Sequence, residues 1–170
     1  MWIDYPLRTI GRWKRKYYEY RVRNEVSSMG EGIYIGGPTR LSENTNLGDN
    51  THFNGMIVWG PGYVEIGDNF HSGPGSEIRT ISHNYDEAEA IPYDETWTVE
   101  DVIIGNNVWL GQDVMILPGV EIGEGAIIQA KSLVVDDIPK YAVAGGHPAE
   151  VFKYRDKEHY EQLKRAGKFH

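Results

Sequence analysis

The sequence contains no cysteine, which excludes a disulfide framework, a thiolate metal site and a cysteine nucleophile. It also lacks any apolar run near the roughly 20 residues needed to cross a bilayer. The opening stretch MWIDYPLRTIGRWKRKYYEY has no apolar segment of the kind found in secretion signals. We therefore expect a cytoplasmic protein.

Basic residues are also scarce, because 17 Lys and Arg face 25 Asp and Glu for a net charge of −8. This balance disfavours nucleic acid as the main partner, since binding phosphates requires an excess of cations. Residues 1–28 are the exception, with seven basic and three acidic residues. We predict a basic helix over residues 4–25. Such a helix fits contact with an anionic membrane surface or a lipid-linked substrate, or packing on a neighbouring subunit.

A repeat with a period of six dominates the rest of the chain. From Thr98 onward it places aliphatic residues at Ile104, Leu110, Ile116, Ile122, Ile128 and Val134. A second series follows four residues after each of these, at Val108, Val114, Val120, Ala126, Ser132 and Ile138. The same period runs upstream less regularly, through Ile35, Leu41, Leu47, Phe53, Gly60, Ile66, Ser72 and Ile78.

A period of six fits neither a helix, which repeats near 3.6, nor an ordinary strand, which repeats at 2. It predicts an all-β solenoid in which three hexads form one triangular coil and stacked coils pair as parallel strands. The repeat gives roughly five coils over residues 31–155, so residues 1–170 form a single domain. A short helix over residues 156–166, ending at Gly167, closes the chain.

The repeat is interrupted between His83 and Thr98 by NYDEAEAIPYDETW, residues 84–97. A loop of this length in a tight solenoid is typical of a binding face. We interpret it as an arm that reaches a neighbour or covers an active site, the alternative being a tolerated surface insertion.

Two stretches, IGNNVWLGQDVMILPGVEIGEGAIIQAKSLVVDDIP and YAVAGGHPAEVFKYR, resemble hexapeptide-repeat acetyltransferases of the galactoside, maltose, Nod-factor, O-antigen and xenobiotic types. The resemblance covers the solenoid, residues 31–155. It implies a left-handed parallel β-helix, a homotrimer, acetyl-CoA as the acyl donor and no metal. It specifies the acceptor poorly.

The resemblance places the family's catalytic histidine on His83, in TISHNYDE. The chemistry agrees, because a neutral imidazole is suited to take a proton from an attacking hydroxyl or amine near pH 7. Taken alone, His83 would be interpreted as a polar corner residue. A metal hydrase of the γ-carbonic anhydrase type is an alternative, with His52 and His71 as further ligands. The spacing of the histidines argues against it.

By the same resemblance, CoA lies in a groove between solenoids. The residues expected along it are Trp109, Gly111, Gln112, Ala130, Lys131, Val135 and Lys153. Asp136 and Glu150 stand where the family often has basic residues. Lys131, Lys140, Lys153 and Arg155 are the cations available to compensate.

The acceptor side is expected to involve Asn54 and the arm residues Tyr85, Asp86, Tyr93 and Trp97. Aromatic and carboxylate groups suit a sugar ring and its hydroxyls, and ordinary loop composition would give the same residues. The preferred acceptor is a sugar hydroxyl or amine, on a nucleotide- or lipid-linked sugar. An antibiotic acceptor and an inactive structural trimer are the alternatives.

Overall fold

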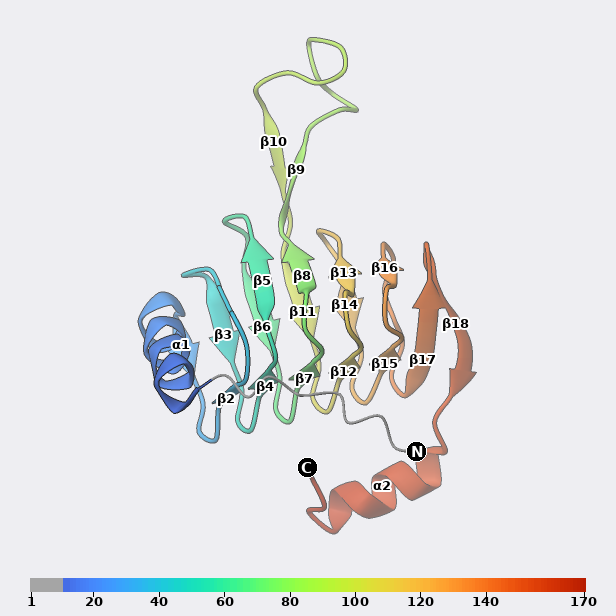
Figure 1. Ribbon diagram of the computed structural model, residues 1–170. Coiled ribbons are helices and arrows are strands. Elements are labelled where there is room, and N and C mark those ends of the chain that lie inside the picture. Colours follow the sequence, from blue (N-terminus) through green and yellow to red (C-terminus); the bar gives the residue numbers. More distant parts are fainter. Residues whose placement is uncertain (1–10) are drawn as a thin grey trace, which may run out of the picture.

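The computed structural model describes residues 11–170, which form a triangular parallel β-solenoid with a helix at each end (Figure 1). Helix α1 spans Arg12–Glu25 and helix α2 spans Lys157–Arg165. The part of the predicted 4–25 helix that precedes Gly11 lies outside the described residues.

The strands stack on three faces. The first face holds β1 (Ser28–Met29), β3 (Thr45–Leu47), β6 (Val64–Ile66), β11 (Val102–Ile104) and β14 (Glu121–Ile122). The second holds β2 (Tyr34–Ile35), β4 (His52–Phe53), β7 (His71–Ser72), β12 (Trp109–Leu110), β15 (Ile127–Ile128) and β17 (Ala142–Gly146). The third holds β5 (Met56–Trp59), β8 (Ser76–Arg79), β13 (Met115–Ile116) and β16 (Leu133–Val134). The coils make about six turns, one more than the repeat count predicted.

The predicted hexad positions form the core. The leading aliphatic residues from Ile104 to Val134 and the second series from Val108 to Ile138 are all at most 3% exposed. Each fully buried Ile, Leu or Val contributes about 1.5–3 kcal/mol relative to an exposed side chain. The expected all-β parallel solenoid is therefore confirmed.

Three corners join the faces. The asparagine corner, between the first and second faces, turns at Asn50, Asn69 and Asn107, whose φ angles are 53°, 54° and 60°. Asparagine tolerates this left-handed conformation better than most residues. The side chains stack as a ladder, because Asn50 Nδ2 donates to Asn69 Oδ1 and Asn69 Nδ2 to Asn107 Oδ1, both at 2.9 Å. The ladder fixes the register of successive coils at this corner.

The other two corners differ in how much chain they carry. The Gly111 corner, between the second and third faces, contains Asn54, Gly111–Gln112 and Ala130–Lys131 in short turns. The arm corner, between the third and first faces, contains Pro118 and Val135 and the long excursion after Thr80.

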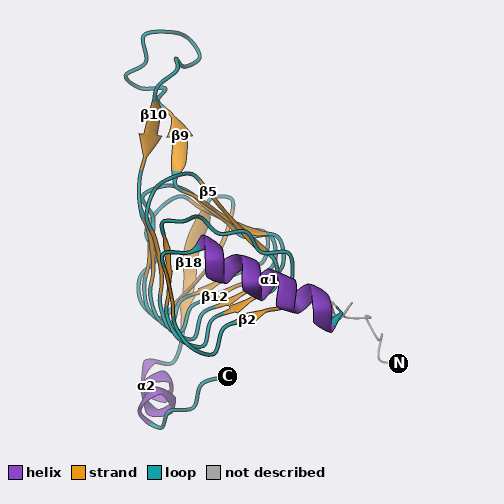
Figure 2. Ribbon diagram, turned by 90° about the vertical axis from the view of Figure 1, so that its left-hand side faces the viewer, coloured by secondary structure: helices purple, strands orange, loops and turns teal. Residues whose placement is uncertain are grey.

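That excursion is a β-hairpin. Strands β9 (Ile81–His83) and β10 (Trp97–Val99) pair antiparallel, with His83 opposite Trp97. The hairpin and its tip project far from the solenoid (Figures 1 and 2). A second antiparallel strand, β18 (Ala149–Tyr154), pairs with β17 and ends the solenoid, which the hexad pattern did not predict.

The helices close the two ends of the chain in different ways. Helix α1 lies across the first coil, where Val22 is buried and the Arg15 guanidinium lies 5.2 Å from the centre of the Tyr34 ring (Figure 2). Helix α2 folds back along the solenoid below β12 and β15 (Figure 1). Between residues 11 and 170, no helix is long and apolar enough to cross a membrane.

Candidate active site

A hollow of about 250 Å³ lies where the arm leaves the solenoid. We call it the arm pocket. Its walls come from Ser82–Asp86 of the arm, from Thr98 and Glu100 on the returning strand, and from Leu117, Pro118 and Val135 of the next two coils. The hairpin register sets this geometry, because pairing of Val99 with Ile81 returns Glu100 to the coil beside the start of the arm.

His83 is held between two aromatic rings in this pocket. Its ring stacks on Tyr93 at 3.7 Å between centroids with an interplanar angle of 16°, and lies 3.9 Å from the Trp97 ring. Packing on both faces of the imidazole restricts its rotation, so its nitrogen atoms point along fixed directions. The Nδ1 atom is buried without a hydrogen-bond partner among residues 11–170. A buried polar atom of this kind is costly unless a ligand or a second chain satisfies it.

The carboxylates of Asp86 and Glu100 also line the arm pocket, while none of its lining residues is Lys or Arg. Glu100 reaches over Gly119, where a Cβ atom would lie 2.6 Å from Glu100 Oε2. Gly119 has a φ of +83°, so its backbone conformation favours glycine. Sequence reasoning missed Glu100, Leu117 and Pro118. The hairpin register returns Glu100 to the pocket, and stacking of β13 on β8 brings Leu117 and Pro118 there from the next coil.

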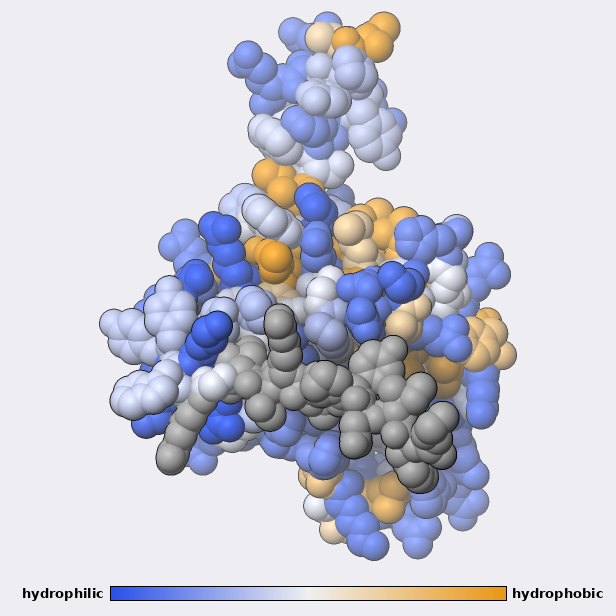
Figure 3. Space-filling model, viewed as in Figure 1, coloured by the Kyte–Doolittle hydropathy of each residue, from blue (hydrophilic) through white to orange (hydrophobic). Residues whose placement is uncertain are grey.

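The tip of the arm is ordered by hydrogen bonds to Asp94. The hydroxyl and backbone N–H of Thr96 donate to Asp94 Oδ1 at 2.5 and 2.8 Å, and the N–H of Glu89 donates to Oδ2 at 2.8 Å. Donation from Thr96, followed by that from Glu89, holds the pKa of Asp94 below its usual value. The tip is otherwise exposed and mostly hydrophilic on the face seen in Figure 3, and Ile91 at its end is 99% exposed.

The predicted acceptor residues divide between two places. Tyr85 and Asp86 line the arm pocket, and Tyr93 covers one face of His83. Asn54 lies instead at the Gly111 corner, where its Nδ2 donates to the carbonyl of Ser72 at 3.0 Å. A single chain therefore does not bring Asn54 to His83.

The predicted cofactor residues also fall at two corners. Gly111, Gln112, Ala130 and Lys131 stack on consecutive coils at the Gly111 corner, whereas Val135 lies across the third face in the arm pocket. The reason is the length of a coil. The paired residues Trp109 and Ile127 of successive coils are 18 positions apart, whereas Ala130 and Val135 lie at the two ends of one face. A Cβ on Gly111 would lie 2.5 Å from Ala130 N, so only glycine fits there. Lys131 Nζ pairs with Asp113 at 3.2 Å.

Two further cofactor candidates lie away from both corners. Trp109 projects from the second face into a separate hollow beside α2 and is 55% exposed. Lys153 lies exposed on β18, opposite Val143.

Two other histidines of the solenoid, His52 and His71, stand apart from His83. Their ring centroids lie 4.3 Å apart with an interplanar angle of 40°, on the adjacent strands β4 and β7 of the second face. Within residues 11–170, no group of three or more His, Cys, Asp or Glu side chains converges as metal ligands do. The hydrase alternative therefore has no ligand set in the described part of the chain.

Comparison with known proteins gives the family. The family described as "Bacterial transferase hexapeptide (six repeats)" matches residues 101–135. Galactoside O-acetyltransferase of Escherichia coli is 33% identical over 84% of this chain and 72% of its own length. A chloramphenicol acetyltransferase of Klebsiella aerogenes is 37% identical over 43% of this chain, but the match spans only 41% of that enzyme.

Similar solved structures belong to the same family. A hexapeptide-repeat acetyltransferase from Vibrio cholerae, complexed with acetyl-CoA, superposes with a TM-score of 0.71 at 25% identity, over 82% of this chain and 77% of that one. A galactoside acetyltransferase in complex with CoA gives a TM-score of 0.68 at 30% identity, over 78% of this chain and 68% of that one. The predicted class, an acyltransferase, is confirmed by these relatives. The chain belongs to the hexapeptide-repeat acetyltransferase family.

Proposed function

We propose that this protein transfers an acetyl group from acetyl-CoA to a sugar hydroxyl or amine, with His83 as the general base. The observation that carries the proposal is the position of His83: its ring is fixed by Tyr93 and Trp97 in the wall of the arm pocket. Acetyl-CoA is the donor, in keeping with the acetyl-CoA and CoA complexes of the similar structures.

The proposed reaction is direct. His83 takes the proton from the acceptor O–H or N–H as that oxygen or nitrogen attacks the thioester carbonyl carbon. A new C–O or C–N bond forms and the C–S bond breaks. The CoA thiolate leaves and recovers the proton from the imidazolium. A positioned base of this kind typically contributes 10²–10⁴-fold to the rate, and no covalent enzyme intermediate is needed.

The predicted cofactor residues lie at two different corners of one chain, and this supports a homotrimer in which neighbouring chains complete the site. Val135 lies beside His83, while Gly111, Gln112 and Ala130 lie at another corner. In the proposed assembly, the arm corner of one chain faces the Gly111 corner of the next, and CoA lies in the groove between them. Because Gly111 has no side chain, the pantetheine chain can approach its backbone closely. Lys131, Lys140 and Lys153 are exposed cations available to its phosphates, and Lys131 also pairs with Asp113.

The same assembly accounts for the acceptor residues. Asn54 is at the Gly111 corner, so a neighbouring chain would supply it to the arm pocket. There it would join Tyr85, Asp86 and Glu100, which offer an aromatic face and hydrogen-bond acceptors for sugar hydroxyls or an ammonium group. Nucleotide- and lipid-linked sugars are the preferred acceptors. Helix α1 supports the lipid-linked form, because its Trp13 and Tyr20 are exposed beside basic side chains.

The first test is calorimetric titration of the purified protein with acetyl-CoA, free CoA and ATP, together with a mass measurement and a metal assay. We expect a trimer that binds acetyl-CoA with a Kd near micromolar, about −8 kcal/mol. Bound zinc without acetyl-CoA binding would contradict the proposal in favour of a hydrase. If the protein binds neither acetyl-CoA nor zinc, the result favours a structural trimer.

The second test removes the arm. Deletion of residues 84–97 should abolish use of sugar acceptors while leaving acetyl-CoA affinity within a few-fold of the intact protein. Chloramphenicol belongs in the acceptor screen because of the partial match to its acetyltransferase. Equal loss of acceptor use and acetyl-CoA binding would contradict the assignment of the arm to the acceptor side.

A further inference from the structure

A larger hollow, of about 450 Å³, lies between α2 and the second face of the solenoid. We call it the α2 pocket. Its size is within the range of about 300–1,000 Å³ typical of small-molecule sites. It is separate from the arm pocket, with which it shares no lining residue.

The α2 pocket is basic in an acidic protein. Arg155, Lys164 and Lys168 line it, and none of its lining residues is Asp or Glu, although the chain carries a net charge of −8. Lys164 is paired with Glu124, which also accepts from the Tyr160 hydroxyl at 3.1 Å, so Arg155 and Lys168 are the lining cations that remain to meet a ligand. Such a concentration of cations attracts anions of phosphate type.

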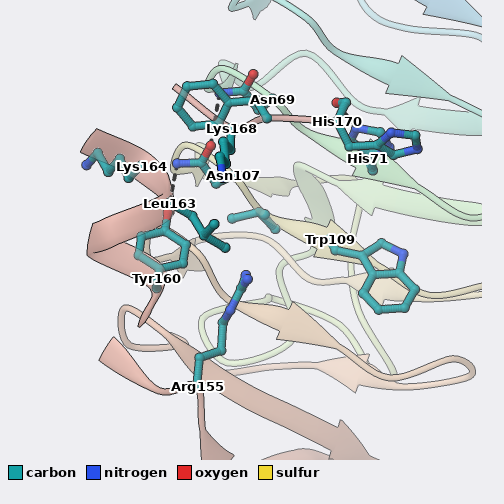
Figure 4. A pocket seen from close by; sticks show the side chains of 12 residues that line it. Asn69, His71, Asn107, Trp109, Arg155, Tyr160, Leu163, Lys164, Lys168 and His170 are labelled. Atoms are coloured by element: carbon teal, nitrogen blue, oxygen red, sulfur yellow. Dashed lines mark hydrogen bonds between the residues drawn. The ribbon is translucent and has the colours of Figure 1, made fainter. Parts of the chain in front are cut away.

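Aromatic surfaces complete the pocket. Trp109 is 55% exposed and Phe169 47% exposed, and both line it. In Figure 4, Trp109 and Tyr160 stand on opposite sides, with the Arg155 guanidinium pointing into the space between them. Exposed aromatic faces inside a hollow offer stacking surface to a planar ring.

The floor of the pocket is preformed. Asn107 Nδ2 donates to the Tyr160 hydroxyl at 2.7 Å, which ties α2 to the end of the asparagine ladder. Arg155 Nη1 donates to the carbonyl of Gly125 at 3.2 Å, and its guanidinium lies 4.8 Å from the centre of the Tyr160 ring. A ligand therefore meets walls that are already positioned, which lowers the entropic cost of binding.

We propose that the α2 pocket binds a phosphorylated nucleoside, with the phosphates at Arg155 and Lys168 and the base against Trp109 or Phe169. The proposal does not depend on the assignment of His83 or of the arm pocket. Two sources would supply this chemistry: a separate nucleotide, or the 3′-phospho-ADP portion of a CoA molecule.

The test uses the full chain and calorimetric titration with ADP, adenosine and pyrophosphate. We expect ADP to bind more tightly than either fragment, because only ADP presents both a ring and phosphates. Lys168→Glu should weaken ADP binding about tenfold or more through loss of one charge-assisted contact and a new repulsion. The matched control is Arg165→Glu, which makes the same charge change on α2 but does not line the pocket, and it should leave ADP binding within about twofold.

Competition between ADP and acetyl-CoA then shows whether the pocket binds a separate nucleotide or the nucleotide portion of CoA. Displacement of ADP by acetyl-CoA, with Lys168→Glu weakening both ligands, would assign the pocket to the CoA nucleotide. Simultaneous binding of ADP and acetyl-CoA would assign it to a separate nucleotide. The proposal is overturned if ADP fails to bind at about 1 mM, if adenosine or pyrophosphate binds as well as ADP, or if Lys168→Glu and Arg165→Glu affect ADP equally.

Discussion

The arm pocket and the α2 pocket are built in opposite ways on the same solenoid. The arm pocket has two carboxylates, no Lys or Arg, and a wall made by a hairpin that projects away from the body. The α2 pocket is lined by three Lys or Arg side chains and by no Asp or Glu, and one wall is tied to the solenoid through Tyr160. Repetition of one coil therefore gives a uniform core, while the segments that interrupt or follow the repeat supply most of the charged side chains of each hollow.

The two pockets should respond differently to loss of an aromatic side chain. Trp97→Ala removes one of the two rings that hold His83, so we expect kcat to fall about tenfold through misplacement of the base. The KM for acetyl-CoA should stay within about twofold, and Trp97→Phe should restore most of kcat. Steady-state kinetics would measure both.

The control for this prediction is Tyr154→Ala, on β18, where the side chain is 57% exposed and lines neither pocket. It should leave kcat unchanged. A rise in KM for acetyl-CoA in Trp97→Ala, with kcat retained, would show that Trp97 does not position His83.

In the α2 pocket the corresponding aromatic change should lower stability rather than kcat. Tyr160→Phe deletes a hydroxyl that accepts from Asn107 and donates to Glu124, so we expect a loss of about 1–2 kcal/mol in the free energy of unfolding. Urea denaturation would measure it. Tyr154→Phe, at a 57% exposed position on β18, should change stability by less than about 0.5 kcal/mol. Equal effects of the two changes would contradict the role of Tyr160 in fixing α2.

The second face should also make the fold sensitive to acid. Burial, and then the charge of His71, lowers the pKa of His52, and burial lowers the pKa of His71 although a hydrogen bond to the carbonyl of His170 opposes it. Below the usual histidine pKa of about 6.5 the unfolded chain therefore binds more protons than the folded one, so stability falls as the pH is lowered.

The variant that tests this is His71→Gln. Thermal unfolding at pH 7.5 and pH 5.5 should show a smaller loss of stability in the variant than in the unchanged protein. The effect should be modest, since both rings are partly exposed. An equal loss in both proteins would assign the acid sensitivity to other groups.

The core and the pockets differ in how far the sequence predicts them. The side chains from Ile104 to Val134 repeat every six residues, so their inward orientation follows from local spacing alone. The sequence also predicts that His83 lies where the repeat is interrupted. It does not predict which residues surround His83, because Glu100, Trp97 and Tyr93 reach it through the register and folding of the hairpin.

The cofactor residues show the same limit. Resemblance placed Gln112, Ala130 and Val135 along one groove, and the turn length places them at two corners of one chain. The α2 pocket had no sequence signal, because it depends on α2 folding back onto a face that is distant in sequence. Sequence therefore predicts what repeats locally, and structure is needed for contacts between segments that do not repeat.

The measurement that tests the central claim most directly is the rate of acetyl transfer by His83→Ala at saturating acetyl-CoA, using the acceptor found in the screen. We predict a fall of at least about 10²-fold, with acetyl-CoA affinity and assembly mass unchanged. His52→Ala, a histidine of the same solenoid that lines neither pocket, should transfer within about threefold of the unchanged protein. Retained transfer in His83→Ala would remove His83 from the mechanism and the arm pocket from its assigned role.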